Sequence, residues 1–522
     1  MNKGPLIGGL ILLAGACNHG AGHQHHGMIH TVVEDGFLPP RDAASLPLVA
    51  PTSILDVEDG GRVELTLTPV RSTINGVDVV LYGYNGQVPG PLVRAPQGAE
   101  ITFHVTNAID FQTTTHWHGV RLDNRFDGVP GMTEDPSQPG EAARYVVAFQ
   151  DEGVYWYHPH VREDIQQDLG LYGNLLIAAD DPGAYAPVHR EEVIMLDDFL
   201  VDDDGAPVPY GGDNANFPLM GRFGNVMLVN GREAEQYALE VDRGSIVRFF
   251  ITNVASARTF RWRIPGVQLK RVGSDAGRYE REEWVESVTI GPAERYVIDA
   301  RFDVAGEHAI VHESPVSTRA LGAVVVSERA AEALDGDEQF SRLRANADVS
   351  ADIDRYRHEF SRPADEKLRI DVDLDMSHAM AMDHEDHATG DGIEWEDAMP
   401  MMNAMSSKAN TQWKLLDTNT GKINMDIDWT FARGSIVKIR VLNDASFAHP
   451  MQHPIHFHGQ RFLVVSTNGK DNDNLVWKDT VLIPAGSWVD LIFEMSNPGK
   501  WMFHCHIAEH LTNGMMGVLT VE

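Results

Sequence analysis

Short segments in which apolar and polar residues alternate recur along the chain, and three of them are copies of one pattern. Each copy begins with Gly, ends with Asn nine residues later, and has apolar residues at the third, fifth and seventh positions after the Gly. The copies are 98–107 (GAEITFHVTN), 244–253 (GSIVRFFITN) and 434–443 (GSIVKIRVLN). Because neighbouring side chains of a strand point to opposite faces, this period of two predicts three half-buried β-strands.

A second segment is repeated downstream of each copy. It spans 153–160, 306–314 and 499–506, and its tails read HPH, HES and HCH. Repetition at intervals of about 150–190 residues predicts tandem domains rather than a solenoid. The many short alternating segments, with 47 Gly and 27 Pro, favour an all-β class and a Greek-key β-sandwich for each repeat.

We therefore predict three tandem domains. Their expected bounds are 51–182, 183–330 and 366–522, and 331–365, rich in Ala, Asp, Glu and Arg, is expected to be a partly helical connector. A chain of 522 residues is too long for a single core, which agrees with this division. The formal net charge of −34 argues against nucleic acid as a partner. It suits a well-solvated surface, or a field that attracts cations.

Residues 1–17 have the features of an export signal. Lys3 precedes a short apolar run, and small residues precede Cys17. The run is too short to span a membrane. The small residues before Cys17 resemble a bacterial lipoprotein box, although Ala14 stands where Leu is usual, so ordinary cleavage near Ala16 is the alternative. Either way we expect an extracytoplasmic protein, periplasmic or membrane-anchored through a lipidated Cys17, with 18–50 as a His-rich tether.

Candidate metal ligands fall in four clusters. A His-x-His pair on a strand places both imidazoles on one face, and the residue between them faces the other way. Cys505 can therefore face one metal while both flanking His face another. A His₂Cys site with a weak axial Met is the ligand set of a blue-copper electron-transfer centre. The clusters are His116-Trp117-His118, His158-Pro159-His160, His453-Pro454-Ile455-His456-Phe457-His458, and His504-Cys505-His506 followed by His510 and Met515.

In these four motifs, in this order, the chain resembles the multicopper oxidases, which include laccases, ascorbate oxidase and the bacterial copper-tolerance oxidases. The resemblance runs from about residue 60 to the C-terminus. It implies a cupredoxin fold for each domain and four copper ions, namely one type 1, one type 2 and a type 3 pair. Carried over residue by residue, it implies His453, Cys505, His510 and axial Met515 for type 1, His116 and His456 for type 2, His118, His158 and His506 for one type 3 copper, and His160, His458 and His504 for the other.

The tails of the second repeat predict how copper is distributed among the domains. The first domain has Pro159 where the third has Cys505, so it cannot form a blue site. The second domain has only His312 and is expected to be a copper-free spacer. Because the first and third domains each supply two His-x-His pairs, the cluster of eight His is expected between them.

The resemblance also suggests catalytic roles. Electrons would enter at His510 and pass through Cys505, and Asp127, eleven residues after His116, would deliver protons. Many bacterial relatives carry a Glu directly after the last blue-site His, where this chain has Leu511. Met516 is the alternative axial ligand, but the family position is ten residues after the Cys, which is Met515.

The segment 376–405 holds seven of the 19 Met, with His interleaved. No amphipathic period organises it, so we expect a loop outside the core that can be removed without unfolding the domain. Thioethers prefer Cu(I), and a Met run beside a blue-copper domain resembles copper-tolerance oxidases. A surface loop of biased composition is the alternative.

We therefore predict a laccase-like oxidoreductase that couples one-electron oxidation of Cu(I) or phenolic and other aromatic donors to four-electron reduction of O₂ to water, in copper tolerance, and that acts as a monomer. A non-catalytic extracytoplasmic copper-sequestering protein is the alternative, and a copper nitrite reductase is a third reading. Structural zinc fits less well, because zinc favours one compact four-ligand site.

Overall fold

The computed structural model describes residues 36–375, 390–446 and 449–522. The predicted export signal, most of the His-rich tether and the first half of the Met-rich segment lie outside these residues. Within them, no helix is both long and apolar enough to cross a membrane.

Six sheets make up the described chain, two in each of three successive sandwiches. The first sandwich pairs a sheet of β2 (Arg62–Ile74), β3 (Val77–Tyr84), β5 (Glu100–Asn107) and β7 (Ala142–Ala148) with a sheet of β1 (Ile54–Asp56), β4 (Leu92–Pro96), β6 (His116–His118), β8 (Gly153–His158) and β9 (Gly173–Ala178).

The second sandwich pairs a sheet of seven strands with a sheet of five. The larger sheet contains β10 (Arg190–Phe199), β11 (Val226–Val229), β12 (Arg232–Glu233), β14 (Ser245–Asn253), β16 (Gln268–Ser274), β17 (Gly277–Val285) and β19 (Arg295–Phe302). The smaller sheet contains β13 (Ala238–Arg243), β15 (Phe260–Arg263), β18 (Val288–Ile290), β20 (Gly306–Glu313) and β21 (Thr318–Ala330).

The third sandwich follows the same plan. Its larger sheet contains β22 (Glu366–Leu374), β23 (Thr411–Asp417), β25 (Ile436–Asn443), β27 (Phe462–Thr467), β28 (Lys470–Asp471), β29 (Trp477–Lys478) and β31 (Ser487–Glu494). Its smaller sheet contains β24 (Asp428–Phe431), β26 (His453–Phe457), β30 (Thr480–Ile483), β32 (Gly499–Cys505) and β33 (Met516–Val521). The prediction of an all-β chain of three tandem cupredoxin-like sandwiches is confirmed.

The helices of the described chain are short and lie between strands. They are α1 (Glu163–Gln166), α2 (Ala347–Asp354), α3 (Pro400–Met405) and α4 (Ala508–Thr512), with 3₁₀ turns at Ala43–Ser45, Asn124–Phe126, Ala234–Gln236, Asp337–Ser341, Arg357–Glu359 and Asn424–Asp426.

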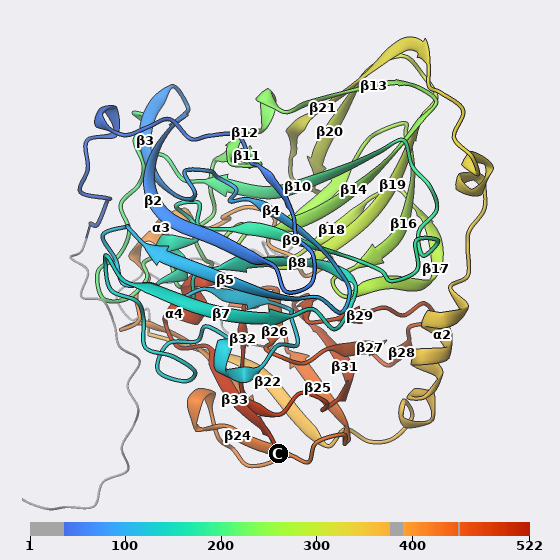
Figure 1. Cartoon of the computed structure of the whole chain (residues 1–522). Coiled ribbons are helices and arrows are strands. Elements are labelled where there is room, and N and C mark those ends of the chain that lie inside the picture. Colours follow the sequence, from blue (N-terminus) through green and yellow to red (C-terminus); the bar gives the residue numbers. More distant parts are fainter. Residues whose placement is uncertain (1–35, 376–389, 447–448) are drawn as a thin grey trace, which may run out of the picture.

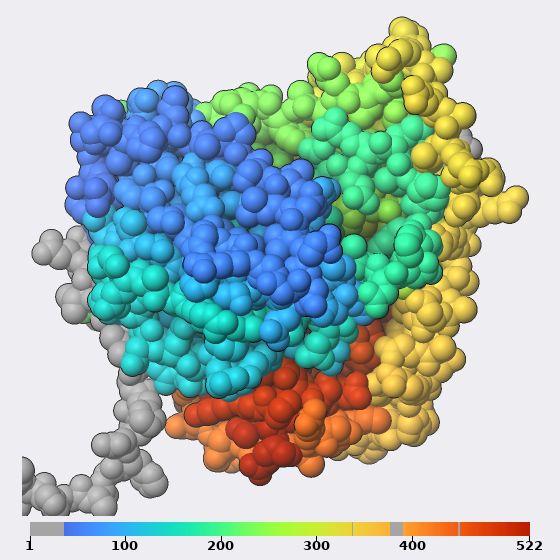
Figure 2. Space-filling model, viewed as in Figure 1, coloured from blue at the N-terminus to red at the C-terminus, as the bar shows by residue number. Residues whose placement is uncertain are grey.

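Figure 1 shows the first sandwich in blue and cyan beside the second in green, with the third in orange and red below both. The connector that contains α2 runs along one side of the molecule from the second sandwich to the third, and it is the yellow band in Figure 2. The first and third sandwiches therefore share an interface although almost 200 residues separate them in sequence.

The three copies of the sequence pattern occupy equivalent places in the three sandwiches. The strands β5, β14 and β25 each pair in parallel with one neighbour, β2, β10 or β22, and antiparallel with another, β7, β19 or β31. The Asn that ends each copy has the same role, because in every domain its side-chain amide donates to two backbone carbonyls in loops or at strand ends. The repeated Asn is therefore explained by loop anchoring rather than by metal binding.

The expectation of half-buried strands is wrong for one copy. β5 alternates between buried and exposed positions, whereas all nine residues of β14 are buried. Arg248, on the face of β14 that a half-buried strand would expose, forms an ion pair with Asp299 and donates to Ala186 O in the segment that joins the first two domains. The second sandwich is covered on this face as well, which the period of two does not reveal.

The second half of the Met-rich segment also differs from expectation. Ile393 and Trp395 are buried, and Arg258, itself fully buried, donates to Trp395 O and to the Glu396 carboxylate. Asn403 of α3 is fully buried; its side chain accepts from Met220 N and donates to Gly221 O. This part of the segment is fixed to the second domain, so 376–405 cannot be treated as one removable loop.

Candidate metal centres

One candidate centre is enclosed within the third domain. Cys505 ends β32, His453 begins β26 and His510 lies in α4, and none of the three is exposed. The Nδ1 atoms of His453 and His510 lie 3.5 and 3.6 Å from Cys505 Sγ. Trp413 packs against both imidazoles, at ring-centroid distances of 4.5 and 4.9 Å.

The environment of this centre favours neutral imidazoles and a cation. Burial lowers the pKa of His453 to about 3 and that of His510 well below its ordinary value. Burial also raises the pKa of the Cys505 thiol. Since the thiolate is the form that binds metal, a bound cation is what would ionise this buried group.

The two neighbouring Met residues point into different surroundings. Met515 belongs to the main core cluster together with Cys505, and its carbonyl accepts a hydrogen bond from Cys505 N at 3.2 Å. Met516 stands opposite His504 in the β32–β33 ladder. Its side chain belongs to a separate small cluster with Val129, Met502 and Leu511. Met516 therefore packs in a cluster that does not contain Cys505, and Met515 stays the predicted axial ligand.

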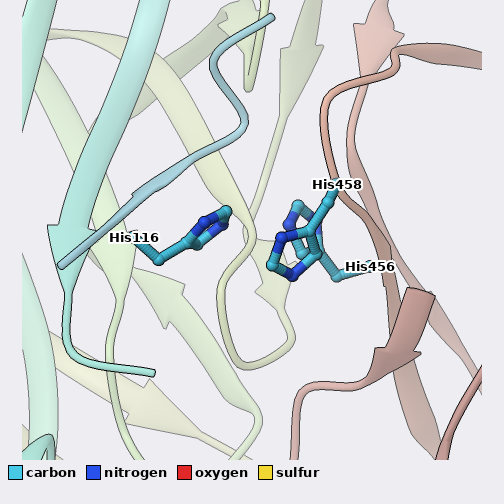
Figure 3. Close-up of side chains that lie close together, drawn as sticks. All are labelled: His116, His456 and His458. Carbon is cyan, nitrogen blue, oxygen red and sulfur yellow. The ribbon is translucent and has the colours of Figure 1, made fainter. Parts of the chain in front are cut away.

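The second candidate centre gathers eight His between the first and third domains. All eight are at most 5 % exposed. Strand register aligns them, because His116 pairs with His158 across β6 and β8, and His456 pairs with His504 across β26 and β32. Figure 3 shows His116 of the first domain pointing toward His456 and His458 of the third. The full set is His116, His118, His158, His160, His456, His458, His504 and His506.

Backbone carbonyls orient four of these rings. In each, Nδ1 lies 2.7–2.9 Å from a carbonyl oxygen, which can only accept, so the proton sits on Nδ1 and Nε2 is left for a metal. The pairs are His116 with Asp127 O, His158 with Pro159 O, His456 with Asp479 O, and His504 with Cys505 O.

Carboxylates orient two further rings. His160 Nδ1 lies 2.8 Å from Glu163 Oε1, and His458 Nδ1 lies 3.0 Å from Asp127 Oδ2. Burial acts to lower the pKa of His160, but the Glu163 carboxylate outweighs it, so this pKa is raised. Asp127 thus contacts His116 through its carbonyl and His458 through its side chain, one from each domain.

His118 has the opposite orientation. Its Nε2 lies 3.0 Å from both Asp479 Oδ1 and Thr480 Oγ1, which leaves Nδ1 toward the cluster. The close trio of His118, His456 and Asp479 could be mistaken for a metal site. However, Arg295 engages both carboxylate oxygens, and although burial opposes ionisation, Arg295 holds the pKa of Asp479 well below its ordinary value. Asp479 is therefore a hydrogen-bonding partner of the ligands rather than an open ligand.

The structure groups the predicted ligands only partly as the resemblance does. Three sets of ring nitrogens lie within 4.8 Å of one another. One set, His160 with His458 and His504, is one of the two predicted type 3 triplets. The others join His116 to His456 and His458, and His116 to His118 and His158. His506 is in none of these sets, although its ring centroid lies 5.0 Å from that of His118 and 5.3 Å from that of His158.

The donor set fits copper. Six buried ring nitrogens that face the cluster have no hydrogen-bond partner within the described chain, a state that costs free energy unless a metal is bound. Imidazoles with one thiolate suit copper better than the thiolate-rich sets of structural zinc. The unpaired atoms are Nε2 of His116, His158, His160, His456 and His506, and Nδ1 of His118.

Leu511, which stands where many bacterial relatives carry a Glu, and the nearby Glu509 lie in contrasting environments. Leu511 is buried in the apolar cluster with Val129. Glu509 is buried as well, neither of its carboxylate oxygens has a hydrogen-bond partner among the described residues, and burial with the nearby Asp164 raises its pKa to about 8. In the second domain, His312 Nδ1 accepts from Arg261 N at 2.9 Å, which is a structural use of this His.

Sequence reasoning missed four residues at these centres. Glu163 carried a readable signal, since it lies only three residues after His160 in the sequence. Trp413, Asp479 and Arg295 carried none, because each reaches the site from a strand or loop distant in sequence.

Comparison with known proteins gives a consistent family. Two family models described as multicopper oxidase match residues 66–182 and 395–522. Multicopper oxidase MmcO of Mycobacterium tuberculosis is 26 % identical over 87 % of this chain and 86 % of its own length. Copper resistance protein A of Escherichia coli is 25 % identical, covering 92 % of this chain and 95 % of its own.

A solved structure described as a multicopper oxidase from Campylobacter jejuni and a metallo-oxidase matches with a TM-score of 0.68, at 24 % identity, over 93 % of this chain and 98 % of its own. This likeness concerns the fold. The family models cover the two domains that supply every predicted ligand. The chain is therefore similar to the multicopper oxidases in both of the domains that supply the predicted ligands, and over most of its length to the two curated relatives.

Proposed function

We propose that this chain couples one-electron oxidation of Cu(I) to four-electron reduction of O₂ to water, in copper tolerance. The observation that supports this proposal most strongly is that the end of β32 contributes to both candidate centres. Cys505 Sγ faces His453 and His510 at 3.5 and 3.6 Å, while the flanking His504 and His506 lie in the cluster of eight His. A protein that only sequesters copper has no need of a covalent link between two centres, so that alternative is not favoured.

We further propose four copper ions with the ligand division that the family resemblance implies. Bound copper would supply one-electron chemistry at the first centre and O₂ reduction at the second. Cys505 and its neighbours would carry the electrons, and His510 would receive them from the donor. Asp127, which is fully buried and contacts ligands from two domains, would hold protons for transfer to the reduced oxygen.

The first centre is covered by Trp413, the 217–221 loop and α3, and this cover favours a small donor over a bulky phenol. His510 has no exposed surface, and Trp413 lies on its ring and donates to Pro218 O. The next two residues of that loop are held by hydrogen bonds from their backbone N–H groups to Ser406 and Asn403. Phenolic donors, the second candidate, would have to transfer electrons through this cover.

The cover carries thioethers that suit Cu(I). On α3, Met401 is 71 % exposed and Met405 is 58 % exposed, whereas Met399 and Met402 are half-buried against the core. The interleaved His and the remaining Met of the segment lie outside the described residues.

Oxygen uptake with two donors tests this function. We expect rapid uptake with Cu(I), slower uptake with a bulky phenol, and about four copper ions per chain by elemental analysis. Copper binding without oxygen uptake from any donor would favour the sequestering protein, and faster turnover with the phenol would make the laccase activity primary. Reduction of nitrite in place of O₂ would favour a copper nitrite reductase.

We also propose that the chain acts outside the cytoplasm as a monomer, with Cys17 as the attachment point if it is lipidated. Replacement of Cys17 by Ser should then move the protein from the membrane fraction to the soluble fraction. An unchanged distribution would favour ordinary signal cleavage.

A further inference from the structure

The second domain, which has no ligand motif of its own, reaches a hydrogen-bonding partner of the cluster ligands through the side chain of Arg295. Arg295 begins β19, and it is fully buried. Its guanidinium makes a fork to both carboxylate oxygens of Asp479 in the third domain, at 2.7 Å for the Nη1–Oδ1 contact. Its Nε donates to Val154 O at 2.7 Å. Val154 is in β8, the strand of the first domain that ends at His158, so one side chain touches all three domains.

Asp479 in turn touches a ligand from each of two domains. Its Oδ1 lies 3.0 Å from His118 Nε2, and its carbonyl accepts from His456 Nδ1 at 2.9 Å. Because an ionised carboxylate can only accept, it fixes the proton of His118 on Nε2 and turns Nδ1 toward the cluster. The two rings are stacked, with centroids 3.7 Å apart.

Gly119 shows how tightly this contact is built. It directly follows His118 and has φ +83°. A Cβ atom there would lie 2.3 Å from Asp479 Oδ2 and 2.8 Å from Arg295 Nη2. Any side chain at this position would displace the ion pair, so the Gly of the His-Trp-His-Gly motif has a specific steric task.

Asp275 and Lys478 add two further buried charges next to the Arg295–Asp479 ion pair. Asp275 of the second domain accepts from Arg295 N at 2.9 Å, and it pairs with Lys478 Nζ of the third domain at 3.2 Å. Opposite charges therefore alternate from the cluster into the second domain, and all of them are buried. Such an arrangement has one low-energy geometry, since moving any member would leave a buried charge unpaired.

We propose that Arg295 is a positioning residue of the oxygen-reducing cluster: it holds Asp479 so that the imidazoles of His118 and His456 present fixed nitrogens, and it keeps the carboxylate from binding metal itself. This inference rests on the proposed assignment of these two His as ligands. It gives the copper-free domain a part in the cluster beyond that of a spacer.

Substitution of Arg295 tests the proposal, and Arg248 offers a matched control. Arg248 is also a buried Arg of the second domain with a two-point contact to an Asp, Asp299, at 2.8 and 2.8 Å, but it touches no ligand. We expect Arg295→Met to weaken copper binding at the cluster about 10–100-fold, the usual range for loss of such a partner. Type 2 electron paramagnetic resonance and the near-ultraviolet absorption of the type 3 pair should change, while the blue absorption stays.

Two milder variants keep the test decisive if Arg295→Met fails to fold. Arg295→Lys retains the charge but loses the fork, so it should show a smaller change of the same kind. Gly119→Ala should act in the same direction by displacing Asp479. Arg248→Met should lower the melting temperature without altering the spectra of the cluster.

The outcomes separate this inference from the ligand assignment. Wild-type cluster spectra in a folded Arg295→Met or Arg295→Lys protein would overturn the inference, as would equal spectral losses in Arg248→Met. His118→Ala is the reference for the assignment. If His118→Ala also retains full cluster copper, the assignment has failed; if it loses that copper while the Arg295 variants do not, only the role of Arg295 has failed.

Discussion

The two candidate centres differ in how much of the molecule each one needs. The first is built within a single domain, from two strand ends and one short helix, and Trp413 packs over both of its imidazoles. The second takes four His from each of two domains, and its second layer is polar, with a carboxylate oxygen within 3.0 Å of three of the eight imidazoles and within 3.5 Å of two more.

This difference follows from the task of each centre. An electron carrier needs a fixed ligand cage shielded from water, which core packing supplies. A cluster that reduces O₂ must also receive protons, so buried carboxylates have to remain beside it. The charge of Asp479 is matched by Arg295, which comes from the second domain, the domain without predicted ligands. The comparison predicts that the two centres can be damaged separately, except at the residue that joins them.

Cys505→Ser should therefore give the largest effect, because Cys505 belongs to the first centre and links it to the second. We expect complete loss of the blue absorption and of turnover with every donor, since the copper–thiolate bond gives the colour and the electron path. Absorption spectroscopy and oxygen uptake measure both. A blue, active Cys505→Ser protein would refute the assignment of this centre.

Loss of a cluster ligand from the first domain should separate the two centres. In His118→Ala or His160→Ala, we expect the blue absorption to remain and to bleach on addition of a reductant, because both residues lie outside the first centre. Oxygen uptake should fall to background. Loss of the blue absorption in both folded variants would contradict the division of ligands between the centres.

The sequence was sufficient for the parts of the protein that repeat or lie close together in the chain. Gly-to-Asn copies predicted equivalent strands, and the spacing of Cys505, His510 and Met515 predicted a centre that local structure assembles. Burial of β14 on both faces escaped prediction, because a period of two describes one strand and not what another segment lays over it. Packing of Trp395 escaped for a related reason: single buried residues within a polar, Met-rich segment leave no periodic signal.

Contacts that orient the cluster were largely unreadable from the sequence. Asp127 was found through the family resemblance, and Glu163 could have been found from its spacing to His160. The contact of Arg295 with Asp479 joins residues 184 positions apart and depends on how three domains pack. No local pattern encodes such a contact, although the Gly after His118 marks the space that it needs.

Glu163→Gln tests the difference between the ligands within the cluster. The Nδ1 atoms of His160 and His458 contact carboxylates, whereas those of four other rings contact backbone carbonyls. Removing this charge should make the His160 imidazole a weaker ligand, and we expect about a 10–100-fold loss in copper affinity or oxygen reduction. The blue absorption should not change. Asp164→Asn is the control, because this neighbouring buried acid pairs with Arg162 and Thr512 rather than with a His. Equal losses in both variants would show a general effect of altering α1.

The smallest effect is expected at the cover over the first centre. Met401→Leu combined with Met405→Leu retains apolar bulk but removes two exposed thioethers. If they collect Cu(I), kcat/KM for Cu(I) should fall several-fold while oxidation of a bulky phenol stays the same, because Leu offers no soft donor. Met425→Leu is the control, since Met425 is also exposed (45 %) but lies in a 3₁₀ turn of the third domain outside the Met-rich segment.

A deletion limited to 376–389 complements the substitutions. It spares Trp395, Glu396 and Asn403, whose contacts fix the rest of the segment to the second domain. We expect Cu(I) oxidation to slow further in this variant and the melting temperature to hold. Unchanged Cu(I) kinetics in both the deletion and the Met401/Met405 variant would leave the segment as a surface loop of biased composition, and the buried His510 would then receive electrons by a route that does not involve these thioethers.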